Sequence, residues 1–287
     1  MAPGYDFTWI IWLFFLLLML QPVIAQKALE GTRRRLMASI EEKRNSRVIV
    51  LIHRQETISF FGIPLFRFLN MEDSEEILRA LYMTDSKMNV DIVLHTPGGL
   101  VLAAVQIARA IKRRQGKTTA IIPHYAMSGG TLIALAADEI IMSPDAVLGP
   151  LDPQINGLPA PSIVNLRHLK PADKINDQWL VLADISAKAM KQMQQVVFEI
   201  LQDKMPADKA REFSKMITSG VWTHDRPITA KELTEWGLNV STNIPEEFVK
   251  LMSLYKQPYQ RRQSAVDYIP EPHTNGNNSS KLLHGHR

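Results

Sequence analysis

Two glycine-bearing turns in this sequence contain residue types that could bind a negative charge and attack a carbonyl carbon. The first turn is HTPGG at residues 95–99, and the second is YAMSGG at residues 125–130. Glycine permits backbone conformations that other residues avoid, and it lets N–H groups approach a ligand closely. The second turn places Ser128 where a helix is expected to begin, and the N–H groups at a helix start favour negative charge. We therefore expect Ser128 to act as a nucleophile.

The same two turns could supply an oxyanion hole, a pair of N–H groups that stabilises the negative oxygen of a tetrahedral intermediate. One N–H would come from Gly98 or Gly99 and the other from Gly129, the residue after the serine. Either turn alone could be an ordinary link between a strand and a helix. Their pairing about 30 residues apart, in successive strand–helix units, favours a shared site.

A serine hydroxyl becomes a good nucleophile only when a base within hydrogen-bonding reach accepts its proton. Three kinds of residue could provide or support that base: His224 in a polar segment, Asp152 in a loop, and the two lysines Lys170 and Lys174. Asp152 could orient His224 or could simply stabilise its own loop. The unperturbed pKa of histidine is about 6.5, whereas that of lysine is about 10.4 and must be lowered by burial. We expect His224 to be the base and Asp152 to orient it, with a lysine as the alternative.

The segments around these residues alternate between strands and helices. Runs rich in β-branched residues predict strands at 47–53, 89–95, 118–123 and 139–143. Apolar spacing and end signals predict helices at 74–82, 100–114, 131–137, 177–205, 207–217, 230–236 and 246–256. We expect a loop at 145–161 and extended chain at 221–228. Strand–turn–helix units of this length predict an α/β fold with parallel pairing.

The segment at residues 9–25 is nearly all apolar and uncharged, and it is close to the length of a bilayer-spanning helix. Basic residues follow it, most densely at 33–35, and basic flanks stay on the cytoplasmic side. We expect a single-pass anchor in an inner or plasma membrane, with the rest of the chain in the cytoplasm. The alternative is a cleaved signal peptide, because residues 23–25 resemble a cleavage site, although residues 1–8 lack a basic start.

The composition excludes several classes of function. The 287 residues are 46% apolar, which suffices for a substantial core, and their formal net charge is only +4. So small an excess gives little support to nucleic-acid binding. The absence of cysteine excludes disulfides, thiolate zinc sites and cysteine nucleophiles. We expect neither a metal nor a cofactor.

Four segments are expected: an anchor at 1–26, a juxtamembrane spacer at 27–46, an enzyme domain at 47–256 and a polar, disordered tail at 257–287. The helix within 177–205 carries more apolar residues than one core-facing stripe needs, which predicts a homo-oligomer. The residues concerned are Ile185, Met190, Met193, Val196, Val197, Ile200 and Leu201.

The TPGG turn, the helix after it, and the run MSGGTLIALAADEIIMSPDAVLGPLDPQ at residues 127–154 together resemble the serine dehydrogenase proteinase family. That family is a membrane-linked branch of the ClpP and signal-peptide-peptidase-like superfamily, which has the crotonase ββα-spiral fold. The segments VLIHRQE at 50–56 and WTHD at 222–225 fit the same family, and the resemblance runs from about Arg47 to Val240.

The resemblance implies Ser128 as the nucleophile, the glycines of both turns as the oxyanion hole, and a triad in which an aspartate precedes a histidine. His224 matches that histidine, whereas Lys170 and Lys174 lie where the Ser–Lys branch places its base. We expect a membrane-anchored serine peptidase that acts on peptides or proteins through an acyl-enzyme. Two alternatives remain: an acyl-CoA enzyme of the crotonase type, which needs no nucleophile, and a catalytically weak membrane scaffold with the same fold.

Overall fold

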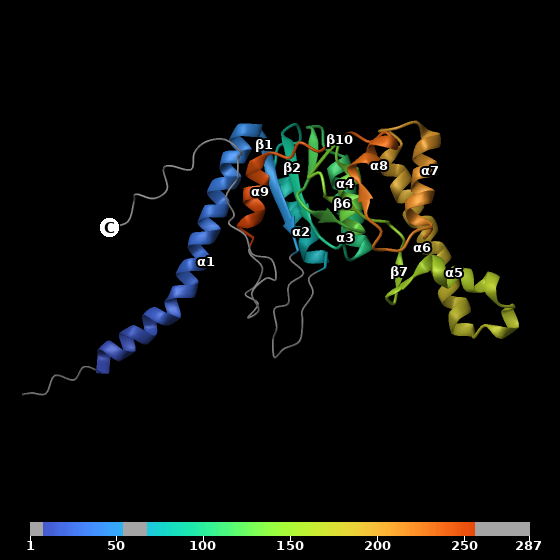
Figure 1. Ribbon diagram of the computed structural model, residues 1–287, viewed down its shortest axis with the longest axis horizontal. Coiled ribbons are helices and arrows are strands. Elements are labelled where there is room, and N and C mark those ends of the chain that lie inside the picture. Colours follow the sequence, from blue (N-terminus) through green and yellow to red (C-terminus); the bar gives the residue numbers. More distant parts are fainter. Residues whose placement is uncertain (1–7, 54–67, 256–287) are drawn as a thin grey trace, which may run out of the picture. The chain divides into compact units, whose positions relative to one another are not determined.

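The computed structural model describes residues 8–53 and 68–255, and a parallel sheet of five strands runs through this part of the chain (Figure 1). The strands lie in the order β1, β2, β3, β5 and β10, and every neighbouring pair is parallel. Their bounds are Ser46–Ile52 for β1, Asn89–His95 for β2, Thr118–Ile122 for β3, Glu139–Met142 for β5 and Val240–Ser241 for β10.

Two smaller sheets lie among the loops. One joins β4 (Tyr125–Ala126), β6 (Val147–Leu148) and β9 (Ile228–Thr229), and the other pairs β7 (Gln154–Ile155) with β8 (Leu158–Pro159). The helices are α1 (Thr8–Arg44), α2 (Met71–Tyr82), α3 (Val101–Lys112), α4 (Gly129–Ala136), α5 (Ala160–Leu169), α6 (Asp177–Leu201), α7 (Ala207–Thr218), α8 (Ala230–Glu235) and α9 (Glu246–Ser253), and a 3-10 turn covers Ala172–Lys174.

Helices cover both faces of the five-stranded sheet. Because successive strand residues point to opposite faces, Ile92 and Leu94 of β2 enter one core, formed with α2, α3, α4 and α6. Val93 enters a second core, where it lies with Ile40 of α1 and Phe248 of α9. Burial on both faces explains why the strands are continuous apolar runs rather than alternating ones.

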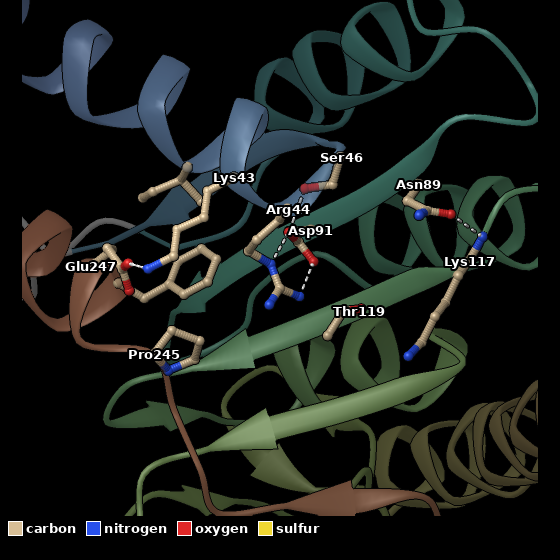
Figure 2. Close-up of a pocket in the computed structure, with 11 residues that line it drawn as sticks. Lys43, Arg44, Ser46, Asn89, Asp91, Lys117, Thr119, Pro245 and Glu247 are labelled. Carbon is tan, nitrogen blue, oxygen red and sulfur yellow. Dashed lines mark hydrogen bonds and ion pairs between the residues drawn. The ribbon is translucent and has the colours of Figure 1, made fainter.

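The last turn of α1 is fixed to the sheet by a charged cluster at the amino ends of the strands (Figure 2). Arg44 donates two hydrogen bonds to Asp91, at 2.6 and 2.9 Å, and Ser46 Oγ donates a third at 2.6 Å. The Asp91 side chain is only 3% exposed. The hydrogen bond with Asp91 raises the pKa of Arg44 above its usual value. Lys43 pairs with Glu247 of α9 beside a cavity of about 410 Å³.

The four predicted strands and seven predicted helices are all present, with ends that differ by up to four residues. The predicted loop at 145–161 is wrong, because it contains β6, β7 and β8 and leads into α5. The extended segment predicted at 221–228 consists mainly of turns and bends. Residues 27–44 of the predicted spacer at 27–46 continue the helix α1, which covers residues 8–44. Strands β6, β7 and β8 have two residues each, which is too short for a periodic pattern to appear in the sequence.

The prediction for the long helix α6 needs a correction. Four of the seven apolar residues named for this helix are buried in the core of the same chain, namely Met193, Val197, Ile200 and Leu201. The exposed apolar side chains of α6 lie in its first half instead. They are Trp179, Val181 and Ile185.

No helix in the two described ranges combines the length and apolar character needed to cross a bilayer. The transmembrane segment expected at 9–25 therefore remains a prediction. The tail predicted at 257–287 lies outside the described residues, as do residues 1–7 of the predicted anchor.

Candidate active site

The turn after β2 and the turn after β3 are in direct contact. A Cβ atom placed on Gly98 would lie 2.7 Å from Ser128 Cβ and 2.8 Å from the carbonyl oxygen of Met127. Two backbone hydrogen bonds join the turns: Met127 N–H donates to the Thr96 oxygen at 2.9 Å, and Thr96 N–H donates to the Tyr125 oxygen at 3.3 Å. Only glycine fits at position 98, and its φ of +94° also favours glycine.

Ser128 occupies a sharp turn between β4 and α4. Its φ is +50° and its ψ is −120°, a conformation that costs free energy in any residue with a side chain. It sits at the N-cap of α4, but its hydroxyl does not cap the helix. The side chain is partly exposed, whereas the whole of α4 behind it is buried. The turn therefore holds the partly exposed Ser128 against a helix that is fully packed into the core.

Two backbone N–H groups next to Ser128 are available for a ligand. The N–H of Gly98 is engaged, because it donates to Thr96 Oγ1 at 3.1 Å. No hydrogen bond within the described part of the chain uses the N–H of Gly99 or of Gly129. A Cβ atom on Gly129 would lie 3.7 Å from the Gly99 nitrogen, so the two groups are near neighbours. Of the three glycines predicted for an oxyanion hole, the geometry favours Gly99 and Gly129.

Asp152 and His224 are hydrogen-bonded to each other. Asp152 Oδ1 lies 2.8 Å from His224 Nδ1, and the side chain of Gln154 donates to Asp152 Oδ2 at 2.7 Å. The Asp152 side chain is 1% exposed, whereas that of His224 is 33% exposed. A carboxylate oxygen that faces an imidazole nitrogen favours the tautomer with its proton on that nitrogen, which here is Nδ1. His224 Nε2 is then the nitrogen that can accept a proton.

The three-stranded sheet brings the segments that carry Ser128, Asp152 and His224 together. Its strand β4 ends two residues before Ser128, β6 ends four residues before Asp152, and β9 begins four residues after His224. Ala126 pairs with Leu148, which pairs in turn with Ile228. No hydrogen bond within the described residues joins Ser128 to His224.

No side-chain hydrogen bond or ion pair within the described residues joins the two candidate lysines to this group. Lys170 follows the last turn of α5, and Lys174 ends the 3-10 turn before α6. Both side chains are exposed, and neither forms an ion pair within the described ranges. Figure 1 shows α5 at the end of α6 that lies away from the five-stranded sheet.

The structure also contains a second acid–histidine pair, which the sequence pattern did not predict. His53 Nε2 lies 3.2 Å from Asp73 Oδ2, and His53 Nδ1 lies 2.9 Å from Thr96 Oγ1, beside the TPGG turn. The signal was the position of His53 at the end of the first strand, since the carboxyl ends of parallel strands meet at one edge. Within the described residues, no three histidine, aspartate or glutamate side chains cluster as metal ligands.

Comparison with known proteins places the chain in a family. The model of the ClpP-like SDH-type serine proteinases matches residues 4–281. Two proteins of Methanocaldococcus jannaschii are similar over most of their length. Uncharacterized protein MJ0137 is 53% identical over 269 residues, which cover 94% of each chain. Uncharacterized protein MJ1495 is 51% identical over 262 residues, which cover 91% of this chain and 89% of the other.

Among solved structures, ClpP1 from Listeria monocytogenes is similar, with a TM-score of 0.43 and 15% sequence identity over 76% of this chain and 94% of that one. The family model, by contrast, covers nearly the whole chain, including both glycine turns and the Asp152–His224 pair. The α/β fold and the contact between the two glycine turns agree with that match. The chain therefore belongs to the ClpP-like SDH-type serine proteinases.

Proposed function

We propose that this serine proteinase hydrolyses peptide bonds through an acyl-enzyme on Ser128, with His224 as the base and Asp152 as the residue that orients it. The observation that carries the proposal is the Asp152–His224 hydrogen bond, made by two loops that leave the same small sheet as the Ser128 turn. Family membership favours a peptidase over an acyl-CoA enzyme. The backbone conformation of Ser128 has a cost that a site without a nucleophile would not need to bear.

The chemistry follows from these positions. His224 Nε2 accepts the proton of the Ser128 hydroxyl while Oγ attacks the carbonyl carbon of the substrate. The carbonyl oxygen becomes negative and accepts hydrogen bonds from the N–H groups of Gly99 and Gly129. The imidazolium of His224 then donates its proton to the departing amine, and the acyl group stays on Oγ. Water hydrolyses this ester, with His224 first accepting the proton of the water and then returning a proton to Oγ.

The positions of the lysines support histidine as the base. A lysine must lose its proton near neutral pH, which requires removal from water or nearby positive charge. Lys170 and Lys174 are both exposed, so they lack the desolvation that this role requires. The unperturbed pKa of a histidine side chain, about 6.5, already suits a base that works near neutral pH.

Peptide turnover by matched variants tests the proposal. We expect Ser128→Ala and His224→Ala each to abolish most turnover, and the double variant to lose no more than either alone, because the two residues act as a unit. Lys170→Ala and Lys174→Ala are the controls and should keep near-normal rates. If His224→Ala stays active while a lysine variant loses activity, the base is a lysine and the proposed triad is wrong.

We further propose that residues 9–25 anchor the enzyme to an inner or plasma membrane, with the peptidase domain in the cytoplasm. The support is the uncharged apolar run and the basic residues after it. Several large apolar side chains of α1 are also exposed in the isolated chain, namely Trp12, Met19, Val23 and Ile24. A phosphatase fused to the C-terminus, active only after export, should remain inactive; strong activity would reverse this topology.

We also propose that the protein forms homo-oligomers through the first half of α6. Val181 is 59% exposed and Ile185 is 44% exposed, and Trp179 is also exposed on the same half of the helix. Val181 and Ile185 are four residues apart and share a face of the helix, and exposed apolar side chains on one face favour burial against a second copy. A chain that starts near Lys27 should elute as an oligomer in size-exclusion chromatography. A monomer at micromolar concentration would contradict the proposal.

A further inference from the structure

A second acid–histidine pair supports the turn that carries Gly98 and Gly99, and it is separate from Asp152 and His224. His53 lies just after β1, and its Nε2 is 3.2 Å from Asp73 Oδ2 in the first turn of α2. The His53 side chain is only 7% exposed. Asp73 is itself held in place by the capping box of α2, in which its carboxylate accepts the N–H of Asn70 at 2.9 Å. The pair therefore rests on a fixed helix end.

The hydroxyl of Thr96 connects this pair to the glycine turn. Thr96 Oγ1 lies 2.9 Å from His53 Nδ1 and accepts the N–H of Gly98 at 3.1 Å. Thr96 is completely buried. A polar group buried this deeply costs free energy unless its partners are present, so each bond in the series depends on its neighbours.

Leu69 fixes the other side of the same turn. The N–H of Leu69 donates to the Gly98 oxygen at 2.7 Å, and the Leu69 oxygen accepts the N–H of Leu100 at 2.8 Å. In a trans peptide unit the C=O and the following N–H point in opposite directions. The Gly98 oxygen points towards the N–H of Leu69, so the N–H of Gly99 points away from it. Gly129 lies close to this N–H, because a Cβ atom on Gly129 would be 3.7 Å from the Gly99 nitrogen.

We propose that Asp73, His53 and Thr96 form a positioning relay that sets the direction of the Gly99 N–H in the oxyanion hole. The inference rests on the function proposed above, because it assigns the relay to the same Ser128 site. The Asp73 carboxylate accepts the proton on His53 Nε2, which leaves Nδ1 as an acceptor for the Thr96 hydroxyl. That donation directs the lone pairs of Thr96 Oγ1 towards the N–H of Gly98. All three are positioning residues, since none of them touches the substrate in this scheme.

The relay predicts a loss of catalysis without a loss of binding. The oxyanion exists only after attack, so a misdirected Gly99 N–H lowers kcat and leaves KM nearly unchanged. Removal of one oxyanion donor costs about 10²- to 10³-fold in kcat. We expect about a tenfold or greater decrease for a donor that is misdirected rather than removed.

Replacement of Thr96 tests this directly in the full-length protein. Thr96→Val keeps the shape of the side chain and removes the hydroxyl, and it should lower kcat by about tenfold or more with KM within about twofold. Thr96→Ser keeps the hydroxyl and should restore most of kcat. His53→Leu should match Thr96→Val, and the double variant should lose no more than either alone.

Thr84→Val is the matched control. Thr84 is also buried, and its hydroxyl donates to the Ala80 oxygen at 2.7 Å, at the end of α2 far from the turn. This variant should keep the kcat of the wild type. A Thr96→Val protein that folds and keeps kcat within about twofold of the wild type would overturn the relay, as would an equal loss in Thr96→Ser.

A spectroscopic measurement separates failure of the relay from failure of the proposed function. Nitrogen-15 NMR of labelled histidines in the full-length Ser128→Ala protein should show His53 protonated on Nε2, with Nδ1 bare. A proton on Nδ1 and none on Nε2 would overturn the relay, even if the wild type proved inactive. Absence of turnover in the wild type, together with the expected tautomer, would count against the peptidase function and leave the hydrogen-bonded relay in place.

Discussion

Asp152 Oδ1 lies 2.8 Å from His224 Nδ1, and the two residues are 72 positions apart in the sequence. The carboxylate is almost fully buried, while the imidazole extends to the surface. A buried carboxylate needs hydrogen-bond donors, and His224 and Gln154 supply them. The arrangement fixes the imidazole with Nδ1 towards Asp152, which leaves Nε2 to act as the proton acceptor in the proposed mechanism.

Asp152→Asn should reduce kcat less than His224→Ala does. The variant weakens the orientation of the ring and the stabilisation of the imidazolium, but it leaves the base in place. In a comparable triad the aspartate contributes about a hundredfold less than the histidine, and we expect a similar ratio here. Peptide turnover measures it, with the exposed Asp145→Asn in the same loop region as the control. Equal losses in Asp152→Asn and His224→Ala would argue that Asp152 does more than orient the ring.

Gly98→Ala should abolish activity. A methyl group there would lie within 3 Å of Ser128 Cβ, the Met127 oxygen and the Gly129 nitrogen, so the two turns would have to separate. Gly157→Ala is the control, because Gly157 also has a positive φ of +78° but nothing lies within 4 Å of the added Cβ. Turnover and thermal unfolding of both variants distinguish the contact from backbone strain. Similar losses in both would mean that strain alone is responsible.

Arg44→Met should destabilise the fold without changing the catalytic site. It leaves the buried Asp91 carboxylate with Ser46 as its remaining hydrogen-bond partner among the described residues, and loss of one member of a buried pair costs about 3–5 kcal/mol. Denaturant unfolding measures the change. Lys188→Met removes an exposed pair with Asp184 and should cost less than about 0.5 kcal/mol. If the two variants prove equally stable, Arg44 does not hold α1 on the sheet.

The stability of the protein should increase between about pH 8 and pH 10.5 through Lys204. Burial lowers the pKa of Lys204 to about 8. Its ammonium donates to the oxygens of Leu135, at 2.8 Å, and Ala137 at the end of α4. In that pH range the unfolded chain binds a proton that the folded chain has lost, so the free energy of unfolding rises with pH.

Lys204→Met isolates this effect, because it removes only the one titration. Denaturant unfolding should show that the stability of the wild type relative to this variant rises by at most about 1.4 kcal/mol per pH unit. The rise should begin near pH 8 and end near the ordinary lysine pKa. A difference between the two proteins that is constant from pH 7 to 10 would mean that the native pKa of Lys204 is not lowered.

The parts of the fold that repeat at a regular interval could be predicted from the sequence. The apolar run of β2, the helical spacing of α3 and the glycine turns between them predict the strand–turn–helix units that place Ser128. Helix α5 was missed because the segment before it is rich in proline and glycine. Pro161, at the first turn of that helix, was a usable signal, because proline is common at helix starts.

Much of the site depends on contacts that no local pattern records. Strands β4, β6 and β9 have two residues each, too few to show a period, yet they gather the segments of the proposed triad. The choice between Gly98 and Gly99 depends on the Thr96 hydroxyl, which occupies the N–H of Gly98. The contact between His53 and Thr96 joins the ends of two strands that pair only in the folded sheet.

Covalent labelling of Ser128 tests the central claim most directly. The full-length protein would be treated with a fluorophosphonate. Mass spectrometry of the intact protein would count the adducts, and mass spectrometry of its proteolytic peptides would locate them. We predict one adduct per chain, located on Ser128, with no adduct in Ser128→Ala and much slower labelling in His224→Ala, because the base must remove the hydroxyl proton. No adduct on the wild type, or an adduct that persists in Ser128→Ala, would contradict the assignment of Ser128 as the nucleophile.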